Sequence, residues 1–421
     1  MRQPAIHPSF HLDEVRYEIR GALTRRARAL EAAGHAVLKL NIGNPGRFGF
    51  RAPAHLTTAI TANLADSDAY GHEQGLESAR EAIVAQQRKR GVEVPGIERI
   101  FIGNGVSELI DLALRALLNP GDEVLLPAPD YPLWSAATIL NAGTPRYYAC
   151  PASRAHLPDP DELEALCGPR TRAIVLINPN NPTGACYPRA LLESIVALAE
   201  RRGVLLLSDE IYDDIRYDDA QFTPLASLTG EVPCVTFSGL SKVHRACGYR
   251  IGWATLSGGG AHIEAYRDAL QLLAALRLCA NVPAQWAIEP ALTGRDTISM
   301  LTAPGGRLHE SRRAMLEGVA RSRFLECVAP EGALYAFPSV RADVLPDFDD
   351  NAFALRLLDE EHALVVPGSS FNLPESRHFR ITLLPEAAEI ADVFARIERV
   401  LARMADENIG AIVRDRRTMG A

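Results

Sequence analysis

The stretch RIFIGNGVSELIDLALRALLNPGDEVLLPA, residues 99–128, decides the fold. The apolar run RIFI is followed by a glycine-bearing turn, then by the amphipathic pattern VSELIDLALRALL and a second apolar run, VLLPA. The same alternation continues downstream, in AIVLI (173–177), LLESIVALAERR (191–202), VLLLS (204–208) and CVTF (234–237). Short apolar strands separated by amphipathic helices predict a mainly parallel sheet with helices on both faces.

The pattern of apolar and polar residues changes beyond about residue 295, and it predicts a smaller α/β layer there. A long helical pattern is followed by GALYAFPSV (332–340), FALRLLDEEH (353–362), ALVVPGSSF (363–371) and HFRITLL (378–384). Near the start of the chain, HLDEVRYEIRGALTRRARALEAAG (11–34) carries one further helical pattern. We therefore divide the chain into an N-terminal arm with part of the small domain (1–48), a large domain (49–298), a C-terminal small domain (299–405) and an appendage without strong apolar periodicity (406–421).

Composition and charge exclude several classes of protein. The 421 residues are 47% hydrophobic and 23% charged, which is typical of globular proteins. The net charge of −8 argues against nucleic acid as a partner. No apolar run is long enough to span a membrane, and acidic residues interrupt the first twenty positions, so we expect a cytoplasmic protein. Seven cysteines occur singly, which indicates neither a disulfide framework nor a metal site.

In sheets of this kind ligands bind beyond the carboxyl ends of the strands, so the residues after each apolar run are informative. Gly103-Asn-Gly-Val-Ser-Glu108 follows the first run and opens a helix. Glycines allow backbone N–H groups to approach an anion, and a helix N-terminus favours negative charge, so this turn is a candidate phosphate cradle. A purely structural turn is an equally common reading of such a segment.

Three further segments at strand ends carry polar groups. They are Asn178-Pro-Asn-Asn181-Pro-Thr-Gly184, Asp209 with Tyr212, and Ser241-Lys242 with Arg250 eight positions on. Taken singly, the first is a rigid turn, the second a helix cap, and the lysine a solvated surface charge. Taken together, they offer a nucleophilic amine, a carboxylate and an anion-binding cation at one edge of the sheet.

The ordered series of motifs resembles the class I/II aminotransferases of the fold-type I enzymes that use pyridoxal 5′-phosphate (PLP). The likeness covers about residues 15–400 and includes Gly43-Asn-Pro, Tyr70, Gly105-Val-Ser107, Asn181, Asp209-Glu-Ile-Tyr212, Ser241-Lys242, Arg250 and Phe379-Arg380. Within that family the strings LNIGNP, PAPDYPLW, INPNNPTGA and GALYAFP are most similar to the bacterial glutamate–pyruvate (alanine) aminotransferases. The resemblance implies a large domain with a mainly parallel seven-stranded sheet, a smaller α/β domain and bound PLP.

The resemblance also implies roles for residues around the cofactor ring. Lys242 would hold PLP as a Schiff base and then move a proton between the substrate Cα and the cofactor. Asp209 would pair with the ring nitrogen, Asn181 and Tyr212 would donate to the ring's phenolate oxygen, and Tyr131 would stack on the ring. Ser241 lies beside the lysine and is expected at the same site.

Further implied roles concern the two anionic groups that the site must bind. Val106, Ser107 and Arg250 would bind the cofactor phosphate, and Tyr70 would reach it from the other subunit of a homodimer. Arg380 would hold the substrate α-carboxylate through a bidentate fork, assisted by Asn181 and the Gly43 backbone.

The expected reaction is alanine + 2-oxoglutarate giving pyruvate + glutamate, with amino acids and 2-oxo acids as the small-molecule partners. Glutamate has a second carboxylate that alanine lacks, and Arg20 in the N-terminal arm is our candidate cation for it. The alternative for Arg20 is an exposed helix residue.

Other interpretations of the same scaffold stay open at this point. The chain could act on an aromatic, branched or pathway-specific amino acid, could decarboxylate or eliminate, could be a PLP-binding regulator, or could be a silent binding protein. A regulator needs an added DNA-binding module, for which the 40 or so residues before Gly43 leave little room. Arg245 departs from the family's lysine signature, which expects a small or apolar residue there. We interpret His72, His244 and Trp134 as supporting or packing residues.

Overall fold

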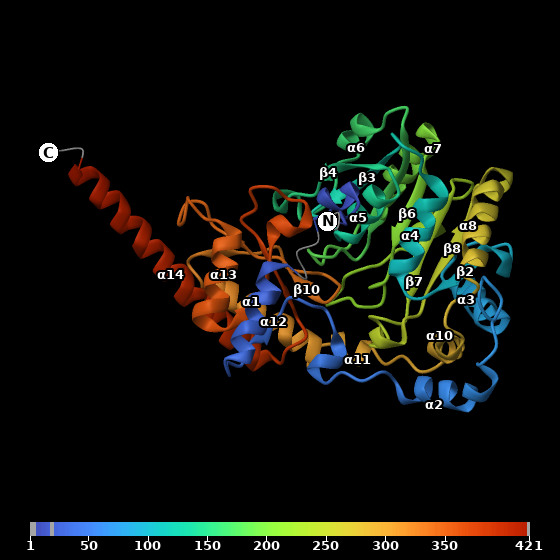
Figure 1. Ribbon diagram of the computed structural model, residues 1–421, viewed down its shortest axis with the longest axis horizontal. Coiled ribbons are helices and arrows are strands. Elements are labelled where there is room, and N and C mark those ends of the chain that lie inside the picture. The colour runs from blue at the N-terminus through green and yellow to red at the C-terminus, as the bar shows by residue number, and fades with distance from the viewer. Residues whose placement is uncertain (1–5, 17–20, 419–421) are drawn as a thin grey trace, which may run out of the picture.

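The computed structural model of the protein describes residues 6–16 and 21–418, which form two bodies that meet along one side (Figure 1). The first, here called the sheet body, contains a seven-stranded sheet in the order β2-β8-β7-β6-β5-β3-β4. Its strands are β2 (Ile100–Gly103), β3 (Glu123–Ala128), β4 (Thr144–Ala149), β5 (Thr171–Ile177), β6 (Leu205–Asp209), β7 (Cys234–Gly239) and β8 (Gly252–Ser257). Strand β8 runs in the opposite direction to the other six, and so pairs antiparallel with β2 and β7. The predicted mainly parallel sheet is confirmed.

Helices cover both faces of this sheet, as the near-continuous apolar strands predict. Alternate residues of β5 show why, because Ile174 and Leu176 join one apolar cluster while Val175 and Ile177 join the other. One face is covered by α4 (Val106–Leu117), α5 (Leu133–Leu140) and α8 (Glu264–Leu276). The opposite face is covered by α2 (Ala54–Ala62), α3 (Glu77–Lys89), α6 (Pro160–Leu166), α7 (Arg189–Arg202), α9 (Val282–Gln285) and α10 (Ile288–Thr293).

The second body, here called the C-terminal layer, packs its own apolar core between short strands and three longer helices. Its helices are α11 (Ser299–Thr302), α12 (Arg307–Arg321), α13 (Asp350–Glu361) and α14 (Ala387–Thr418). Its strands are β9 (Leu325–Glu326), β10 (Tyr335–Ala336), β11 (Ser339–Val340), β12 (Ala363–Leu364), β13 (Val366–Pro367) and β14 (Phe379–Thr382). Residues 406–418, predicted to be an appendage, continue α14 as helix.

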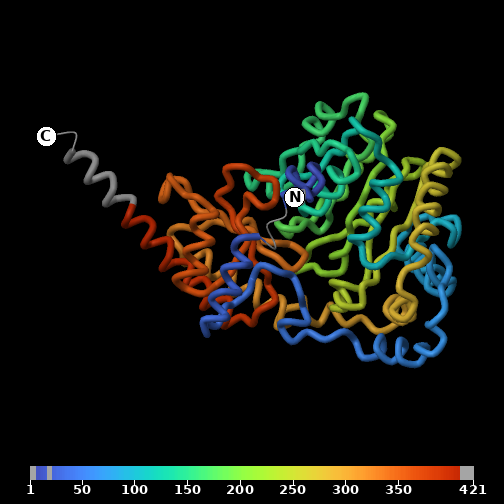
Figure 2. Tube along the Cα trace, viewed as in Figure 1, coloured from blue at the N-terminus to red at the C-terminus, as the bar shows by residue number. Residues whose placement is uncertain are grey.

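Helix and strand within residues 22–39 lie on the C-terminal layer, more than 300 residues away in sequence from the elements they contact, whereas Phe10–Asp13 contact α5. Strand β1 (Leu38–Lys39) pairs in parallel with β12, and α1 (Ala22–Ala32) packs against α13. Figure 2 shows this blue segment running beside the orange and red layer. The predicted helix over 11–34 is wrong in its extent: Phe10–Asp13 form a 3₁₀-helix and α1 starts only after Gly21. Glycine disfavours a helix interior, which accounts for the late start.

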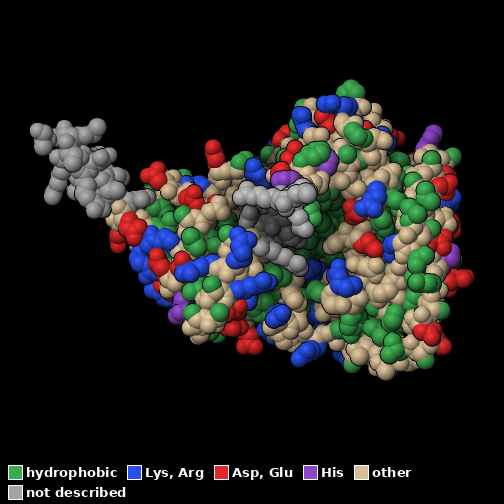
Figure 3. Space-filling view, viewed as in Figure 1, with side chains coloured by type: hydrophobic (Ala, Val, Ile, Leu, Met, Phe, Trp, Pro, Cys, Tyr) green, Lys and Arg blue, Asp and Glu red, His purple; other side chains and the backbone are tan. Residues whose placement is uncertain are grey.

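Charged side chains of both signs are intermixed over the visible face of the C-terminal layer (Figure 3). Arg356 pairs with Glu407, and Arg399 and Arg403 both pair with Glu361. These cross-helix pairs tie α13 to α14 at the surface. No described helix combines the length and apolar character needed to cross a membrane.

Candidate active site

A cavity of about 240 Å³ lies between the sheet body and the C-terminal layer, beyond the carboxyl ends of β5, β6 and β7. The placement agrees with the rule that such sheets bind ligands at that edge. Of the predicted site residues that the structure describes, all line it except Tyr70. The lining residues are Asn41, Ile42, Gly43, Val106, Ser107, Tyr131, Ile177, Asn181, Asp209, Ile211, Tyr212, Ser241, Lys242, Cys247, Arg250, Tyr335 and Arg380.

Lys242 enters the cavity from the loop after β7 and spans the two bodies. Its Nζ donates a hydrogen bond of 2.7 Å to the backbone oxygen of Gly43, which comes from the N-terminal segment. Gly43 must be glycine here because a Cβ atom would lie 2.0 Å from Oη of Tyr335. The close approach of this backbone therefore brings the lysine, the tyrosine and the N-terminal segment together.

Asp209 ends β6 as a buried carboxyl that forms no salt bridge among the described residues. It is 3% exposed, and its Oδ2 accepts a hydrogen bond of 3.2 Å from Nε1 of Trp134. Burial raises the pKa of Asp209 to about 6, against the lowering effect of the Trp134 bond and of Lys242. A carboxyl in this state favours a positively charged partner, as a protonated pyridine nitrogen would be.

Arg380 is a buried cation at the opposite wall. It is 2% exposed, its Nη1 donates to Oδ1 of Asn181 at 3.1 Å, and its Nη2 donates to the backbone oxygen of Asn41. Its Nε has no hydrogen-bond partner among the described residues, and no described carboxylate pairs with it. A buried guanidinium without a counter-charge is costly, so the arrangement fits a carboxylate ligand.

Sequence reasoning assigned no role to Tyr335, which the structure places at the centre of the cavity. Its ring lies under the guanidinium of Arg380 at 4.4 Å, and its hydroxyl accepts a 3.2 Å hydrogen bond from Tyr212. Burial favours a raised pKa for Tyr335, but Lys242 and Arg380 lower the pKa below its usual value. The string GALYAFP contains this tyrosine, but its spacing does not indicate which of its side chains faces the cavity.

The turn after β2 has the features of an anion cradle. Gly105 has a φ of 87°, and α4 begins at Val106 with no side chain capping its N-terminus. A Cβ on Gly105 would lie 2.2 Å from Nη2 of Arg250, so only glycine leaves room for the guanidinium. Arg250 itself donates to the backbone oxygens of Cys247 and Asn104 at 3.0 and 3.2 Å. A helix N-terminus beside an arginine suits a phosphate.

These residues fit PLP on three independent grounds. The turn at Gly105, together with Arg250, suits its phosphate, and the buried Asp209 suits its protonated ring nitrogen. Lys242 lines the same cavity, and its amine would bind the aldehyde carbon of PLP. Asn181, Tyr212, Tyr131 and Ser241 line the space between them.

Two predicted residues are not found at the cavity, for different reasons. Tyr70 is 80% exposed and does not line the cavity of its own chain. Arg20 lies outside the described residues.

Arg245, His72 and His244 were also singled out in the sequence, and they do not line the cavity. Arg245 adopts a left-handed backbone with φ of 54°, and its guanidinium donates to the backbone oxygen of Val243 and to Oγ1 of Thr297. It thus fastens the lysine loop to the segment before α11. Nδ1 of His72 accepts a hydrogen bond from the backbone N–H of Gln74. Burial lowers the pKa of His244 to about 4.

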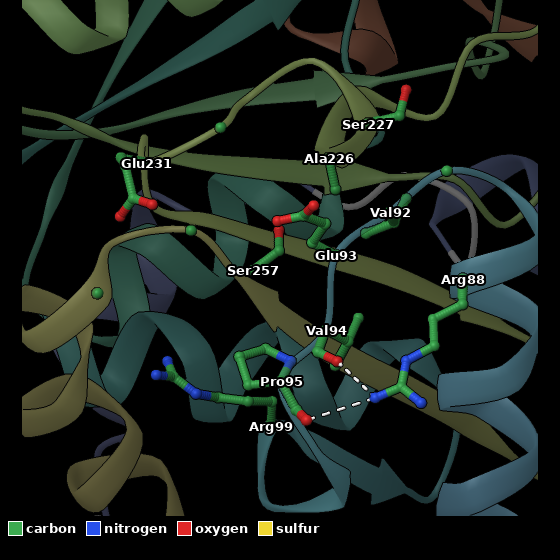
Figure 4. Close-up of a pocket in the computed structure, with 14 residues that line it drawn as sticks. Arg88, Val92, Glu93, Val94, Pro95, Arg99, Ala226, Ser227, Glu231 and Ser257 are labelled. Atoms are coloured by element: carbon green, nitrogen blue, oxygen red, sulfur yellow. Dashed lines mark hydrogen bonds between the residues drawn. The ribbon is translucent and has the colours of Figure 1, made fainter.

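A larger cavity of about 840 Å³ lies at the opposite end of the sheet, where β8 ends and β2 begins (Figure 4). Its arginines are already engaged: Arg88 donates to the backbone oxygens of Val94 and Pro95, and Arg99 pairs with Glu264. Glu93 and Glu231 stand on its walls without a convergent arrangement (Figure 4). It contains none of the residues predicted to bind the cofactor.

Comparison with known proteins agrees with this geometry. The family profile described as "Aminotransferase class I and II" matches residues 36–397. The chain is 46% identical over 397 residues to glutamate-pyruvate aminotransferase AlaA of Escherichia coli strain K12, covering 94% of this chain and 98% of that protein. It is 45% identical over 405 residues to the alanine aminotransferase of Mycobacterium tuberculosis strain H37Rv, covering 95% and 94%. A crystal structure of an aminotransferase from Escherichia coli superimposes with a TM-score of 0.93 at 46% identity, over 95% of this chain and 99% of that chain.

Proposed function

The chain belongs to the family of class I and II aminotransferases, and on that premise we propose that it moves an amino group from L-alanine to 2-oxoglutarate, giving pyruvate and glutamate. It is a PLP-dependent enzyme of the aminotransferase class. The choice of alanine is supported by the names of the relatives at 46% and 45% identity. The observation that carries the reaction type is the cavity that holds Lys242, Asp209 and the unpaired Arg380 together.

Each end of PLP is assigned to residues of this chain. Arg250, Ser107 and the N-terminus of α4 would bind the phosphate, and Asp209 would hold the proton on the ring nitrogen. Tyr131 would lie against the ring, while Asn181 and Tyr212 would donate to its phenolate oxygen. The hydroxyl of Tyr212 donates to the hydroxyl of Tyr335 at 3.2 Å in this structure.

Lys242 is the base for the proton that leaves the substrate. When bound, PLP supplies an electron sink that stabilises negative charge at the substrate Cα. The neutral amine Nζ of Lys242 takes the Cα proton, and Gly43 holds that amine in place through its backbone oxygen, 2.7 Å away. Arg380 binds the α-carboxylate so that the Cα–H bond faces the lysine.

The finer assignment of Arg20 remains part of this proposal. A cation is needed for the distal carboxylate of glutamate but not for alanine, and Arg20 is the candidate in the N-terminal arm. Replacing it with glutamine is expected to lower kcat/KM for glutamate and 2-oxoglutarate while leaving alanine and pyruvate little changed.

A homodimer is the proposed working form, with Tyr70 completing the phosphate site of the neighbouring subunit. Tyr70 is exposed on a loop that Gln271 and Arg277 of the α8 region tie down through Glu73. Leu272, Leu276 and Leu278 are exposed beside that contact. Apolar side chains grouped on a surface favour burial against a second copy. We also propose a cytosolic location, consistent with seven cysteines that are all free thiols.

The test exploits the scarcity of lysine, since the chain has only Lys39, Lys89 and Lys242. Borohydride reduction of the purified protein with PLP should fix the cofactor to the peptide that contains Lys242. Turnover of alanine with 2-oxoglutarate, followed as pyruvate release, should vanish in Lys242→Ala and persist in the control Lys39→Ala. Cofactor fixed to Lys242 together with turnover of other amino acids but not alanine would overturn the substrate assignment alone.

A further inference from the structure

A loop of the C-terminal layer, residues 368–373, lies against the turn that follows β3 of the sheet body. Asn372 in this loop has a left-handed backbone with φ of 53°, which asparagine tolerates better than most residues. Its Nδ2 donates to Oδ1 of Asp130 at 3.0 Å and to Oγ of Ser135 at 2.9 Å. In the reverse direction, the backbone N–H of Asp130 donates to the oxygen of Phe371 at 3.1 Å. Three hydrogen bonds therefore join the two bodies at this point.

Asp130 is a costly residue at this position. It is 0% exposed, no described cation pairs with it, and its Oδ2 makes no hydrogen bond within the described residues. Burial raises the pKa of Asp130 to about 7 despite the hydrogen bond from Asn372. Because a buried carboxyl without a counter-charge opposes folding, its contribution must be sought in what it positions.

Each end of this contact leads directly to a wall of the active site. Asp130 immediately precedes Tyr131, which lines the cavity on the sheet-body side. Phe371 precedes Asn372, and its ring centre lies 4.9 Å from the guanidinium of Arg380. The ring of Tyr335 also lies against that guanidinium, so Arg380 contacts two aromatic rings. Of these two residues, Phe371 is the one whose backbone oxygen is hydrogen-bonded to Asp130 of the sheet body.

We propose that Asp130 and Asn372 are positioning residues that hold Arg380 at a fixed place relative to Tyr131, and thereby set the affinity of the site for the carboxylate shared by its substrates. The inference rests on the proposed function for the identity of those substrates. It adds a determinant of carboxylate affinity that touches neither substrate nor cofactor.

The pattern of kinetic change distinguishes this role from general damage. The α-carboxylate is common to alanine, glutamate, pyruvate and 2-oxoglutarate, so loosening Arg380 weakens all four equally. Lys242, the proton base, is not attached to this contact, and kcat should change much less than KM.

Asn372→Gly is the sharpest single variant because glycine keeps the left-handed backbone and removes only the amide. Loss of its two hydrogen bonds is expected to raise KM for all four substrates by about threefold to tenfold, the scale of one or two such bonds. The matched control is Glu375→Gly, two residues beyond this loop, since Glu375 is exposed and has a φ of 54°. Its KM values should equal those of the wild type. Wild-type KM values in Asn372→Gly would overturn the proposal.

A reciprocal exchange keeps the proposal testable if Asn372→Gly does not fold. Asn372→Asp places a second carboxyl against Asp130 and should weaken carboxylate binding most. Adding Asp130→Asn reverses donor and acceptor, and the Ser135 hydroxyl can face the new carboxylate by giving up its hydrogen bond to the backbone oxygen of Pro132. The double variant should therefore recover most of the lost affinity, and failure to recover it contradicts the proposed contact.

Acetate provides a readout that does not depend on the amino acid used. It carries a carboxylate but cannot react, and its binding to the PLP-loaded enzyme can be followed by calorimetry. Weaker acetate binding in Asn372→Gly supports the inference even if alanine proves not to be the substrate. Unchanged acetate binding contradicts the inference even if alanine is turned over.

Discussion

Among single residues of the active site, Asp209 has a protonation state that depends strongly on burial. Its carboxyl is buried against Trp134 and its pKa is raised to about 6, above the usual 3.8. Between those two pH values the folded protein holds a proton that the unfolded chain has lost. The stability of the cofactor-free protein therefore falls as pH rises through this window, by a contribution on the order of 3 kcal/mol once the group is ionised.

The variant Asp209→Asn should remove this penalty because an amide cannot ionise. Without cofactor, its Tm relative to the wild type is expected to increase from pH 4 to pH 7 and then level off. Thermal unfolding at several pH values measures the difference in Tm between the two proteins. The buried histidines affect both proteins equally, so their contribution cancels in that difference. The control is Asp66→Asn at an exposed position. With PLP bound, Asp209→Asn should lose about a hundredfold or more in kcat, since the ring nitrogen loses its counter-charge. A Tm difference that does not vary with pH would contradict the assignment.

Residues that act through a motif could be read from the sequence, whereas residues that act through packing could not. Lys242, Asp209, Asn181 and Arg250 follow strand ends at recognisable spacings, and the structure gathers them in one cavity. Tyr335 lines the same cavity because it packs on Arg380 and approaches Gly43, neither of which is near it in sequence.

At the scale of elements, the turn between β2 and α4 combines two requirements in Gly105. Its φ of 87° disfavours a side chain, and a Cβ would collide with Arg250. Gly105→Ala should weaken PLP binding by about tenfold or more, because the arginine and the N-terminus of α4 no longer converge. Titration of the cofactor-free protein with PLP measures the change.

Gly121→Ala is a matched control for that prediction. Gly121 has a φ of 91° but no atom within 4 Å of the position a Cβ would take. It carries the same backbone cost without the collision, so its PLP affinity should stay near the wild-type value. Equal losses in both variants would assign the effect to backbone strain rather than to the phosphate site.

The strands and helices of the sheet body followed from their apolar patterns, while the N-terminal helix did not. The strands β2, β3, β5, β6 and β7 coincide with the apolar runs because buried parallel strands need apolar side chains on both faces. The pattern over 11–34 has a helical period throughout, but Gly21 ends its local preference and tertiary contacts with α13 select only Ala22–Ala32. Periodicity predicts where a helix can form, and long-range packing decides where it does.

For the whole molecule, the exposed leucines of α8 and the Tyr70 loop predict how two copies associate. Leu276→Arg places a charge in the proposed interface and should shift the protein from dimer to monomer in analytical ultracentrifugation. Activity should fall in parallel, because in the proposed dimer each site takes Tyr70 from its partner. Leu355→Arg on α13 is the control, being an exposed leucine of the C-terminal layer. A monomer with full activity would contradict the shared site.

The pairing of β1 with β12 affects the order in which parts of the site are completed during synthesis on the ribosome. The residues of this chain proposed to bind PLP, from Val106 to Arg250, are all synthesised by the time the sheet body is complete. Strand β1, which leads into Gly43, is synthesised early but has no strand to pair with until Ala363 and Leu364 emerge, and Arg380 comes later still. Synthesis therefore supplies the residues proposed to bind PLP long before it supplies Arg380, the residue proposed to bind the substrate carboxylate.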